Sequence, residues 1–481
     1  MRRAAVFRIV GFFFMGFSLT LLIPLFISLW YGDGEARHFL VSLVLILLSG
    51  VLFLFLGRGP RQELATRDGF LIVAIFWGGI STVASLPLIL GAHLDFVDAL
   101  FEAVSAFTTT GATVITGLDD LPRSVLFYRQ QLQWFGGMGM IVLAVAVLPM
   151  VGIGGMQLYK AEAPGPLKEE KLTPRLAQTA RVLWVVYLGI TVANALAYWL
   201  AGMSPFDAVA HSLTTVSTGG FSTHDASLGW FHSPVIEAIA VVFMLMGGIN
   251  FSIHFIALRS VDPLAYLRDV EVRTFLLFVL TITLLISLTL FLKGEYPTLS
   301  ASLRNAVFEV VSVVTSTGFG TVDFSRWPDF LPVLLIFISF VGGCGGSTAG
   351  GIKVMRVMVL IQMGLREVRR LIHPNAVLPL RMGGRVLRDR VLEGVWGFFA
   401  AYVMAFVVLM LLMMHAGLDQ VSAFSAIATS MNNLGPGLGR VASTFADVSD
   451  AGKMIAAFAM LLGRLEIFTI LVLLTPEFWK R

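Results

Sequence analysis

Four stretches of the chain combine glycine with threonine, serine or asparagine, and such stretches suit the binding of a cation that has lost its water. A ring of backbone carbonyls can replace the hydration shell of an ion. Glycine permits the backbone angles that turn successive carbonyls inward, and neighbouring hydroxyls can add oxygen ligands. None of the stretches contains a carboxylate. The four stretches are residues 108–114, 216–222, 315–321 and 432–438.

The four stretches recur at spacings of about 100 residues when they are aligned on one glycine each. The segments before the first and third stretches agree as well: Phe-Glu-Ala-Val-Ser at 101–105 and Phe-Glu-Val-Val-Ser at 308–312 lie at the same distance from their glycines. Four units of this length predict one pseudo-symmetric assembly. The aligned glycines are Gly111, Gly219, Gly318 and Gly435.

The segment before each glycine predicts a half-helix that enters the membrane without crossing it. Each segment has about 13 residues, or roughly 20 Å of helix, whereas the hydrocarbon core is about 30 Å thick. Irregular backbone at membrane depth is tolerated where it is buried or lines a wet cavity, and helix C-termini attract cations. A single stretch of this kind is also typical of a close helix contact, but four in phase favour a pore. The segments are 98–109, 205–217, 303–316 and 421–433.

The composition places these stretches in a membrane protein. The 481 residues are 57% hydrophobic and 13% charged, whereas a soluble domain has about 25% charged residues. The segment 9–31 is long enough to span, so we interpret it as a retained helix and not as a signal peptide. Cys344 is the only cysteine, which excludes disulfides within the chain and multi-cysteine metal sites. Further stretches without charges are 41–56, 70–94 and 275–292.

The distribution of basic residues predicts the orientation. When loops are assigned to alternating sides, 25 of the 34 lysines and arginines fall on one side and eight on the other. Basic residues gather on the cytoplasmic side of membrane proteins. Both termini are therefore expected in the cytoplasm, and the positive charge reflects topology, with no nucleic-acid partner.

These motifs resemble the Trk/Ktr/HKT superfamily of potassium transport proteins, and within it the bacterial TrkH/TrkG type. The resemblance rests on the four stretches, on Gly-Gly-Cys-Gly-Gly-Ser-Thr-Ala-Gly-Gly-Ile-Lys at 342–353 and on Phe-Gly-Gly-Met-Gly at 135–139. It implies an all-α polytopic fold with two extra N-terminal transmembrane helices and four span–pore helix–span repeats around a central pore. The expected units are 1–67 for the N-terminal pair, then 68–155, 156–260, 261–375 and 376–481 for the repeats.

The resemblance also implies a function. It implies uptake of potassium ions across the bacterial inner membrane, with the ion as cargo and no organic cofactor. The partners that it implies are membrane lipid, a second copy of the chain in a homodimer, and a cytoplasmic TrkA-like ring of nucleotide-binding domains. The family's filter positions carry over to Gly111 and Ala112, Gly219 and Gly220, Gly318 and Phe319, and Gly435 and Pro436. The filter hydroxyls would be those of Thr110, Thr218 and Thr317.

Glycine at all four filter positions is similar to the potassium-selective pattern of the family, although the fourth stretch lacks the Ser/Thr-Gly sequence of the others. A sodium-conducting pore, or a symporter that couples potassium to sodium or protons, stays open as an alternative. An enzyme is not expected, because the sequence has no H-E-x-x-H, no G-x-S-x-G and no ATP-binding P-loop.

A second feature predicts a gate beneath the filter. The segment 342–351 has six glycines, among them Gly345 and Gly346, and glycine disfavours a helix interior by about 1 kcal/mol each. We expect an intramembrane loop here, with a tight helix crossing as the alternative. Arg464 lies in an apolar run, where arginines usually mark function. It could bind loop carbonyls, repel cations, or reach the membrane surface; Lys353 could serve the gate or be an ordinary inside charge.

Other titratable residues have weaker predicted roles. Glu102 and Glu309, on half-helices, are expected to brace the filter through hydrogen bonds. For His211 and His254 we weigh a proton relay against structural hydrogen bonding, and favour the latter. Three aspartates lie just beyond the glycines, where they could attract cations to the pore mouth: Asp119, Asp225 and Asp323.

Overall fold

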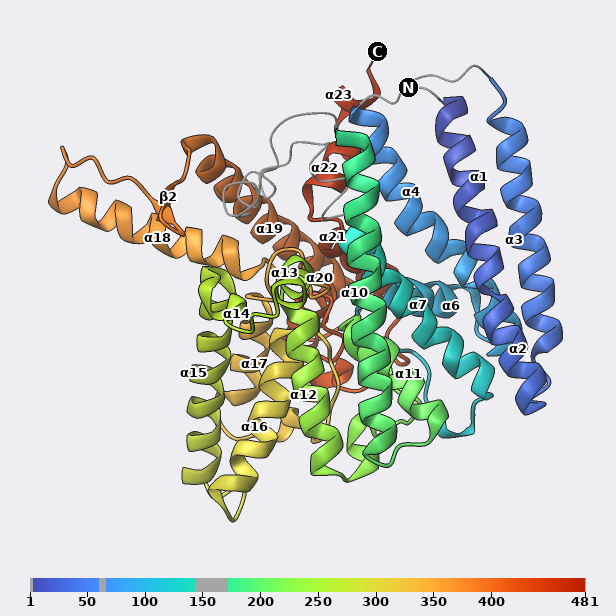
Figure 1. Ribbon diagram of the computed structural model, residues 1–481, viewed down its shortest axis with the longest axis horizontal. Helices are drawn as coiled ribbons and strands as arrows, with labels where there is room; N and C mark the ends of the chain where they lie inside the picture. Colours follow the sequence, from blue (N-terminus) through green and yellow to red (C-terminus); the bar gives the residue numbers. More distant parts are fainter. Residues whose placement is uncertain (1–2, 60–65, 143–171, 481) are drawn as a thin grey trace.

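The computed structural model describes residues 3–59, 66–142 and 172–480, and in these ranges the protein is helical apart from one two-stranded hairpin. The first residues of α1 and the last helix, α23, lie at the same end of the molecule (Figure 1). The boundary expected between residues 155 and 156 lies outside the described residues.

Six helical segments in these described ranges are long and apolar enough to cross a membrane, and up to eight if each of two bent helix pairs forms one span. The protein is therefore a multi-pass membrane protein. The segments are Ala4–Tyr31, Ala36–Leu56, Asp68–Gly91, Ala180–Leu200, Val270–Leu292 and Asp389–His415; the bent pairs are Pro234–Gly248 with Phe251–Ser260 and Asp450–Arg464 with Phe468–Leu474.

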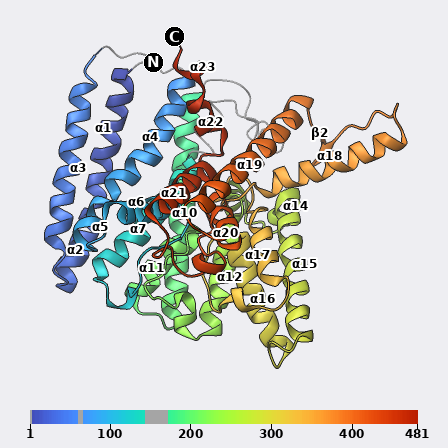
Figure 2. The same cartoon turned by 180° about the vertical axis from the view of Figure 1, so that it is seen from behind.

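The first and third helices, Arg3–Thr20 and Ala36–Leu56, form a closely packed pair at one edge of the molecule (Figure 2). A Cβ atom added to Gly11 would lie 2.8 Å from the carbonyl oxygen of Gly50, so glycine at both positions lets the two backbones approach. The expected span 9–31 falls within the candidate span Ala4–Tyr31. The helices of this region are α1 (Arg3–Thr20), α2 (Leu22–Tyr31), α3 (Ala36–Leu56), α4 (Thr66–Ala84) and α5 (Leu86–Gly91).

Four short helices occupy the positions of the predicted half-helices. Three of them begin at a side-chain cap: Ser204, Thr298 and Asp419 each accept a hydrogen bond from a backbone N–H in the first turn. The helices bury most of their C-terminal halves, so their ends meet inside the protein. They are α6 (Phe96–Phe107), α11 (Pro205–Val216), α16 (Leu299–Val314) and α20 (Gln420–Met431).

Further helices surround these four, and short elements join them. The surrounding helices are α7 (Arg123–Val142), α10 (Leu172–Leu200), α12 (Pro234–Gly248), α13 (Phe251–Ser260), α15 (Val270–Leu292), α17 (Leu331–Ser339), α19 (Asp389–His415), α21 (Asp450–Arg464) and α22 (Phe468–Leu474). The connecting elements are η1 (Leu118–Asp120), η3 (Ser227–Phe231), α14 (Ala265–Arg268), η4 (Phe324–Arg326), η5 (Gly439–Val441) and α23 (Pro476–Trp479).

The predicted break near 342–351 is present, because α17 ends at Ser339 and the next helix, α18 (Val354–Ile372), begins 15 residues later. Helix α18 extends away from the body of the molecule (Figure 1). Its apolar residues Met355, Val359 and Met363 pack with Met382 and Val391, which ties it to the hairpin of β1 (Arg381–Met382) and β2 (Arg385–Val386) and to α19.

Candidate ion pathway

The four glycine-containing stretches share one backbone conformation. Each short helix is followed by a capping residue, then by a residue with φ near +50°, and two residues later by a glycine with a positive φ. The left-handed region is costly for most residues and open to glycine. The first of these positions holds Thr109 (54°), Thr218 (52°), Ser316 (51°) and Asn433 (52°), and the second holds Gly111 (81°), Gly220 (78°), Gly318 (80°) and Gly435 (97°).

This pattern corrects the predicted register in the second stretch. Gly220, and not Gly219, has the conformation of Gly111. Gly219 corresponds instead to Thr110, and Thr218 corresponds to Thr109, so the hydroxyl of Thr218 is not equivalent to that of Thr110. Two adjacent glycines satisfy a sequence alignment equally well, and the end of α11 decides between them. In the fourth stretch the predicted glycine, Gly435, does have the shared conformation.

The same glycines bring the four stretches together in a closed ring. A Cβ atom added to any of them would collide with the carbonyl of the next stretch, so the ring closes only with glycine at these positions. The distances from the added Cβ are 2.2 Å from Gly111 to Gly219 O, 1.9 Å from Gly220 to Thr317 O, 2.1 Å from Gly318 to Leu434 O and 2.7 Å from Gly435 to Thr110 O.

A cavity of about 400 Å³ opens on one side of this ring. Phe319 and Pro436, predicted beside the glycines, contribute to its lining, whereas Ala112 is a buried residue that packs in an apolar cluster. The cavity lining also includes three of the four ring glycines, Gly111, Gly220 and Gly318, and two of the predicted aspartates, Asp225 and Asp323.

The aspartates near this cavity differ in their engagement. Asp225 accepts a hydrogen bond from the backbone N–H of Leu118 at 3.1 Å, and Asp323 pairs with Arg326. Asp119 is paired with His224, whose ring stacks on that of Trp230 at a centroid distance of 3.8 Å. Partial burial lowers the pKa of His224, but hydrogen bonds and charges from Asp207 and Asp119 outweigh it and raise the pKa above its ordinary value. The sequence analysis missed His224.

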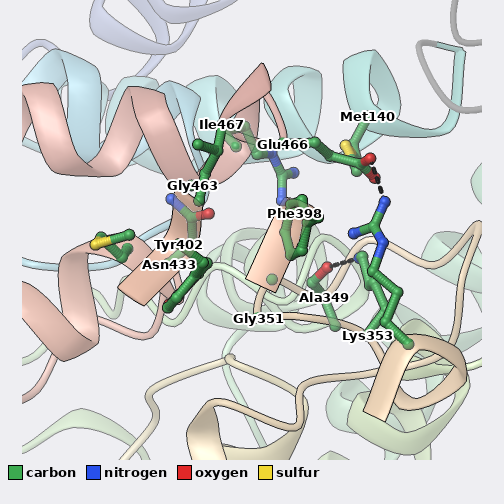
Figure 3. A pocket seen from close by; sticks show the side chains of 14 residues that line it. Met140, Ala349, Gly351, Lys353, Phe398, Tyr402, Asn433, Gly463, Glu466 and Ile467 are labelled. Carbon is green, nitrogen blue, oxygen red and sulfur yellow. Dashed lines mark hydrogen bonds and ion pairs between the residues drawn. The ribbon is translucent and has the colours of Figure 1, made fainter. Parts of the chain in front are cut away.

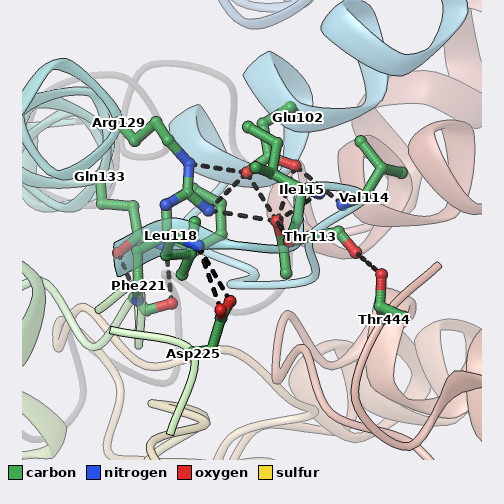
Figure 4. A network of polar contacts seen from close by, with 11 residues as sticks. Glu102, Thr113, Val114, Ile115, Leu118, Arg129, Gln133, Phe221, Asp225 and Thr444 are labelled. Atoms are coloured by element: carbon green, nitrogen blue, oxygen red, sulfur yellow. Dashed lines mark hydrogen bonds and ion pairs between the residues drawn. The ribbon is translucent and has the colours of Figure 1, made fainter. Parts of the chain in front are cut away.

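The predicted bracing by Glu102 is confirmed, and it includes a partner that the sequence analysis did not identify. The Glu102 carboxylate accepts from the backbone N–H of Val114 at 3.0 Å and from the hydroxyl of Thr113. Arg129 of α7 donates to the same carboxylate at 2.6 Å and 2.9 Å (Figure 4). The arginine side chain is 1% exposed and also lies over the ring of Phe221. Arg129 is one of the eight basic residues that charge counting places on the non-cytoplasmic side.

The third stretch has the corresponding brace. Glu309 accepts from the backbone N–H of Thr321 at 3.0 Å and from its hydroxyl at 3.2 Å. In the second stretch the corresponding position, nine residues before the glycine, holds His211. Its Nε2 lies 2.8 Å from the hydroxyl of Ser222, and its Nδ1 lies 2.9 Å from the carbonyl of Asp207.

The fourth stretch and His254 are also held by local hydrogen bonds. In the fourth stretch the hydroxyl of Ser425 accepts from the backbone N–H of Leu438 at 2.9 Å. His254, on α13, has both ring nitrogens in hydrogen bonds, one with the hydroxyl of Tyr266 and one with the carbonyl of Met246. These contacts favour the structural interpretation of both histidines over a proton relay.

The loop 340–353 lies directly under three of the four stretches. Thr348 donates to the carbonyl of Val216 at the end of α11 and contacts the hydroxyl of Thr218, both at 3.1 Å. The backbone N–H of Gly350 donates to Ser316 at 2.6 Å, and a Cβ on Gly350 would lie 2.0 Å from the carbonyl of Asn432. The loop therefore contacts the ends of the second, third and fourth short helices.

Two buried cations hold this loop, and Figure 3 shows their surroundings. Arg464, which is 1% exposed, donates to the carbonyl of Thr348 at 2.9 Å. Lys353 donates to the carbonyl of Ala349. Of the predicted roles of Arg464, the geometry shows binding of a loop carbonyl, and its burial excludes the membrane surface. Glu466 pairs with Arg356 at 2.6 Å, beyond the end of α21.

The predicted loop glycines have a separate anchor. The backbone N–H of Gly345 donates to Glu271 at 2.8 Å, and the carbonyl of Gly346 accepts from the backbone N–H of Phe251 at 3.2 Å. Gly346 has a φ of 76°, which favours glycine at this turn. The loop is thus attached to α13 and α15 as well as to the short helices.

Comparison with known proteins gives a consistent result. The family described as "TrkH: Cation transport protein" matches residues 36–481. The chain is 51% identical to the Trk system potassium uptake protein TrkH of Vibrio parahaemolyticus over the full length of both, and 49% identical to TrkH of Escherichia coli K12 over 99% of each. The crystal structure of the potassium transporter TrkH from Vibrio parahaemolyticus superposes with a TM-score of 0.93 at 48% identity, covering 100% of both chains.

Proposed function

The chain belongs to the TrkH family of cation transport proteins, and from this we propose that it takes up potassium ions across the bacterial inner membrane. The ions would pass through the ring of the four glycine stretches. The observation that carries the proposal is the ring itself, in which each of Gly111, Gly220, Gly318 and Gly435 lies against a carbonyl of the next stretch. The names of the relatives support potassium as the ion.

In this proposal, an ion enters the cavity above the ring and exchanges water for backbone carbonyl oxygens. Such carbonyls supply the ligands that a monovalent cation needs without adding charge. The C-termini of the four short helices end at the ring, and their partial negative charge would offset the cost of removing water. Asp119 and Asp323, whose side chains are 45% and 50% exposed, would attract cations to the cavity.

The loop 340–353 would be the gate. It lies beneath the ring, and both Arg464 and Lys353 bind its carbonyls from below. Two buried positive charges under the ring would also oppose the exit of a cation while the loop is in place. Opening would require Thr348 to leave the carbonyl of Val216 and the guanidinium of Arg464.

We further propose the partners and orientation that the family resemblance implies. The charge distribution favours a cytoplasmic location for both termini. A TrkA-like nucleotide-binding ring would then dock on the same side as the basic residues of α18, which follows the gate directly. A homodimer in the membrane completes the assembly.

The test is ion flux into liposomes that contain only this purified chain. Potassium and rubidium should enter well above sodium, and Gly111→Ser should weaken the discrimination, because its Cβ meets the carbonyl of Gly219. Equal entry of all three ions, or an unchanged ratio in the variant, would overturn the proposal. Sodium entry above potassium would favour the sodium-conducting alternative.

A further inference from the structure

The second stretch differs from the other three at one position of the ring. Gly219 stands where the others have a side chain, and its backbone does not have a positive φ. The conformation therefore does not require glycine here, since ordinary residues occupy the equivalent position elsewhere. These residues are Thr110, Thr317 and Leu434.

A side chain from another unit fills the vacant space. A Cβ added to Gly219 would lie 2.4 Å from both Cδ and Oε1 of Gln133, a fully buried residue of α7. Gln133 thus occupies the volume that a threonine fills in the first and third stretches. This explains why the second stretch alone has two adjacent glycines.

Gln133 also bonds the backbone on both sides of Gly220 (Figure 4). Its amide nitrogen donates to the carbonyl of Gly219 at 2.6 Å, and its amide oxygen accepts from the backbone N–H of Phe221 at 3.1 Å. The Gly219 carbonyl is the one that Gly111 packs against, so this contact lies at the junction of the first and second stretches.

The first and third stretches have local supports that Gly219 lacks. The hydroxyl of Thr110 bonds that of Thr108 at 2.7 Å, and Thr317 bonds Thr315 at the same distance. A glycine has no side chain for such a bond. The amide of Gln133 therefore provides from α7 the anchor that the threonines provide within their own stretches.

We propose that Gln133 is a positioning residue for ion selectivity. It fixes the Gly219 carbonyl and draws on one of that oxygen's two lone pairs, which leaves the other for a cation. The position and strength of coordinating carbonyls set the preference between potassium and sodium. This inference rests on the proposed function, because it assigns a role within the same ring.

The test uses Gln133→Met, which keeps the volume and removes both hydrogen bonds. Two lost buried hydrogen bonds predict a decrease of about tenfold in the potassium-to-sodium flux ratio in liposomes. The matched control is Gln131→Met. Gln131 is buried on the same helix but donates to the carbonyl of Thr20, away from the ring, so the ratio should stay unchanged.

A second variant keeps the test decisive if Gln133→Met does not fold. Gly219→Ala should displace the amide of Gln133 and also lower the potassium-to-sodium flux ratio. Gly219→Ala combined with Gln133→Ala should lower this ratio no further than the more severe of the single variants. An unchanged ratio in Gln133→Met or Gly219→Ala, an equal loss in Gln131→Met, or additive effects would overturn the inference. The unmodified chain tests the proposed function separately, because that proposal fails if this chain does not discriminate.

Discussion

The first and third stretches of the ring have the same upstream sequence pattern, yet their buried glutamates lie in different electrostatic surroundings. Glu102 forms a charge pair with Arg129, whereas Glu309 accepts hydrogen bonds from the hydroxyl of Thr321 and from the backbone N–H groups of Thr321 and Val322. The inner helix of the third unit, α17, has no charged residue that could play the part of Arg129. The two braces share a geometry but not a mechanism of charge compensation.

This difference coincides with what lies below each stretch. In the first unit α7 continues as a regular helix to Val142, and it carries Arg129 and Gln133 against the ring. In the third unit α17 ends at Ser339 and the loop 340–353 follows. The uninterrupted helix α7 thus carries the charged and amide side chains that support the ring. The neutral support at Glu309 belongs to the unit in which the loop 340–353 interrupts the chain after α17. The four stretches therefore share one backbone conformation, whereas the elements that hold them differ.

The largest effect on stability is expected when the charge pair of the first unit is broken. Arg129→Met leaves the Glu102 carboxylate buried without its cation, and removal of one partner of a buried pair costs about 3–5 kcal/mol. We expect a large decrease in the thermal unfolding temperature in detergent. The double variant with Glu102→Gln should recover much of this loss. A stable single variant, or a double variant no better than the single one, would contradict the pairing argument.

Substitution of the two glutamates is expected to cost less stability than Arg129→Met, and the two losses should differ. Glu102→Gln leaves Arg129 unpaired, whereas Glu309→Gln keeps an oxygen acceptor for Thr321 and strands no cation. The loss for Glu309→Gln should be about 1 kcal/mol, and the loss for Glu102→Gln should exceed it. Unfolding of both variants under one condition tests the order. The reverse order would mean that the third unit depends on a charge more than the first.

The role of the loop 340–353 can be tested at Arg464. Arg464→Ala removes the hydrogen bond to the carbonyl of Thr348 and a positive charge below the ring. We expect roughly 2- to 10-fold greater potassium flux in liposomes with an unchanged potassium-to-sodium ratio. A flux equal to or below that of the unmodified chain would contradict a holding role for Arg464. A changed ratio would mean that the loop contributes to selectivity.

Much of this arrangement could be predicted from sequence because it follows from local chemistry. The segment 421–433 predicts α20, observed as Gln420–Met431, since its length and its cap at Asp419 are local features. Six glycines in ten residues predict that no helix covers 342–351, and none does. The positive φ of Gly111 likewise follows from the need for glycine at a turn that no other residue adopts easily.

The remaining features depend on contacts between distant parts of the chain. The register at Gly219 and Gly220 is set by where α11 ends and by Gln133, which lies 86 residues earlier. Charge counting places Arg129 among the eight basic residues of the outer side, whereas the structure buries it against Glu102. For Gln133 itself the sequence gives no local signal, because a buried glutamine is recognised only through the groups that it bonds.

The smallest expected effect concerns His224, at the mouth between the first and second units. Asp207 and Asp119 raise its pKa, so the protonated ring stabilises the fold fully below its ordinary pKa of about 6.5, and this contribution is lost as pH rises through the raised value. Because the group is partly exposed, we expect the unfolding temperature to fall by only roughly 1–3 °C over this range. His224→Gln should remove that dependence, whereas His232→Gln, at an exposed histidine of the same loop, should keep it. Equal pH dependence in the unmodified chain and His224→Gln would show that the bridge from Asp119 to Asp207 does not stabilise the mouth. The hydrogen bond from Leu118 to Asp225 would then remain there as a polar link between the first and second units.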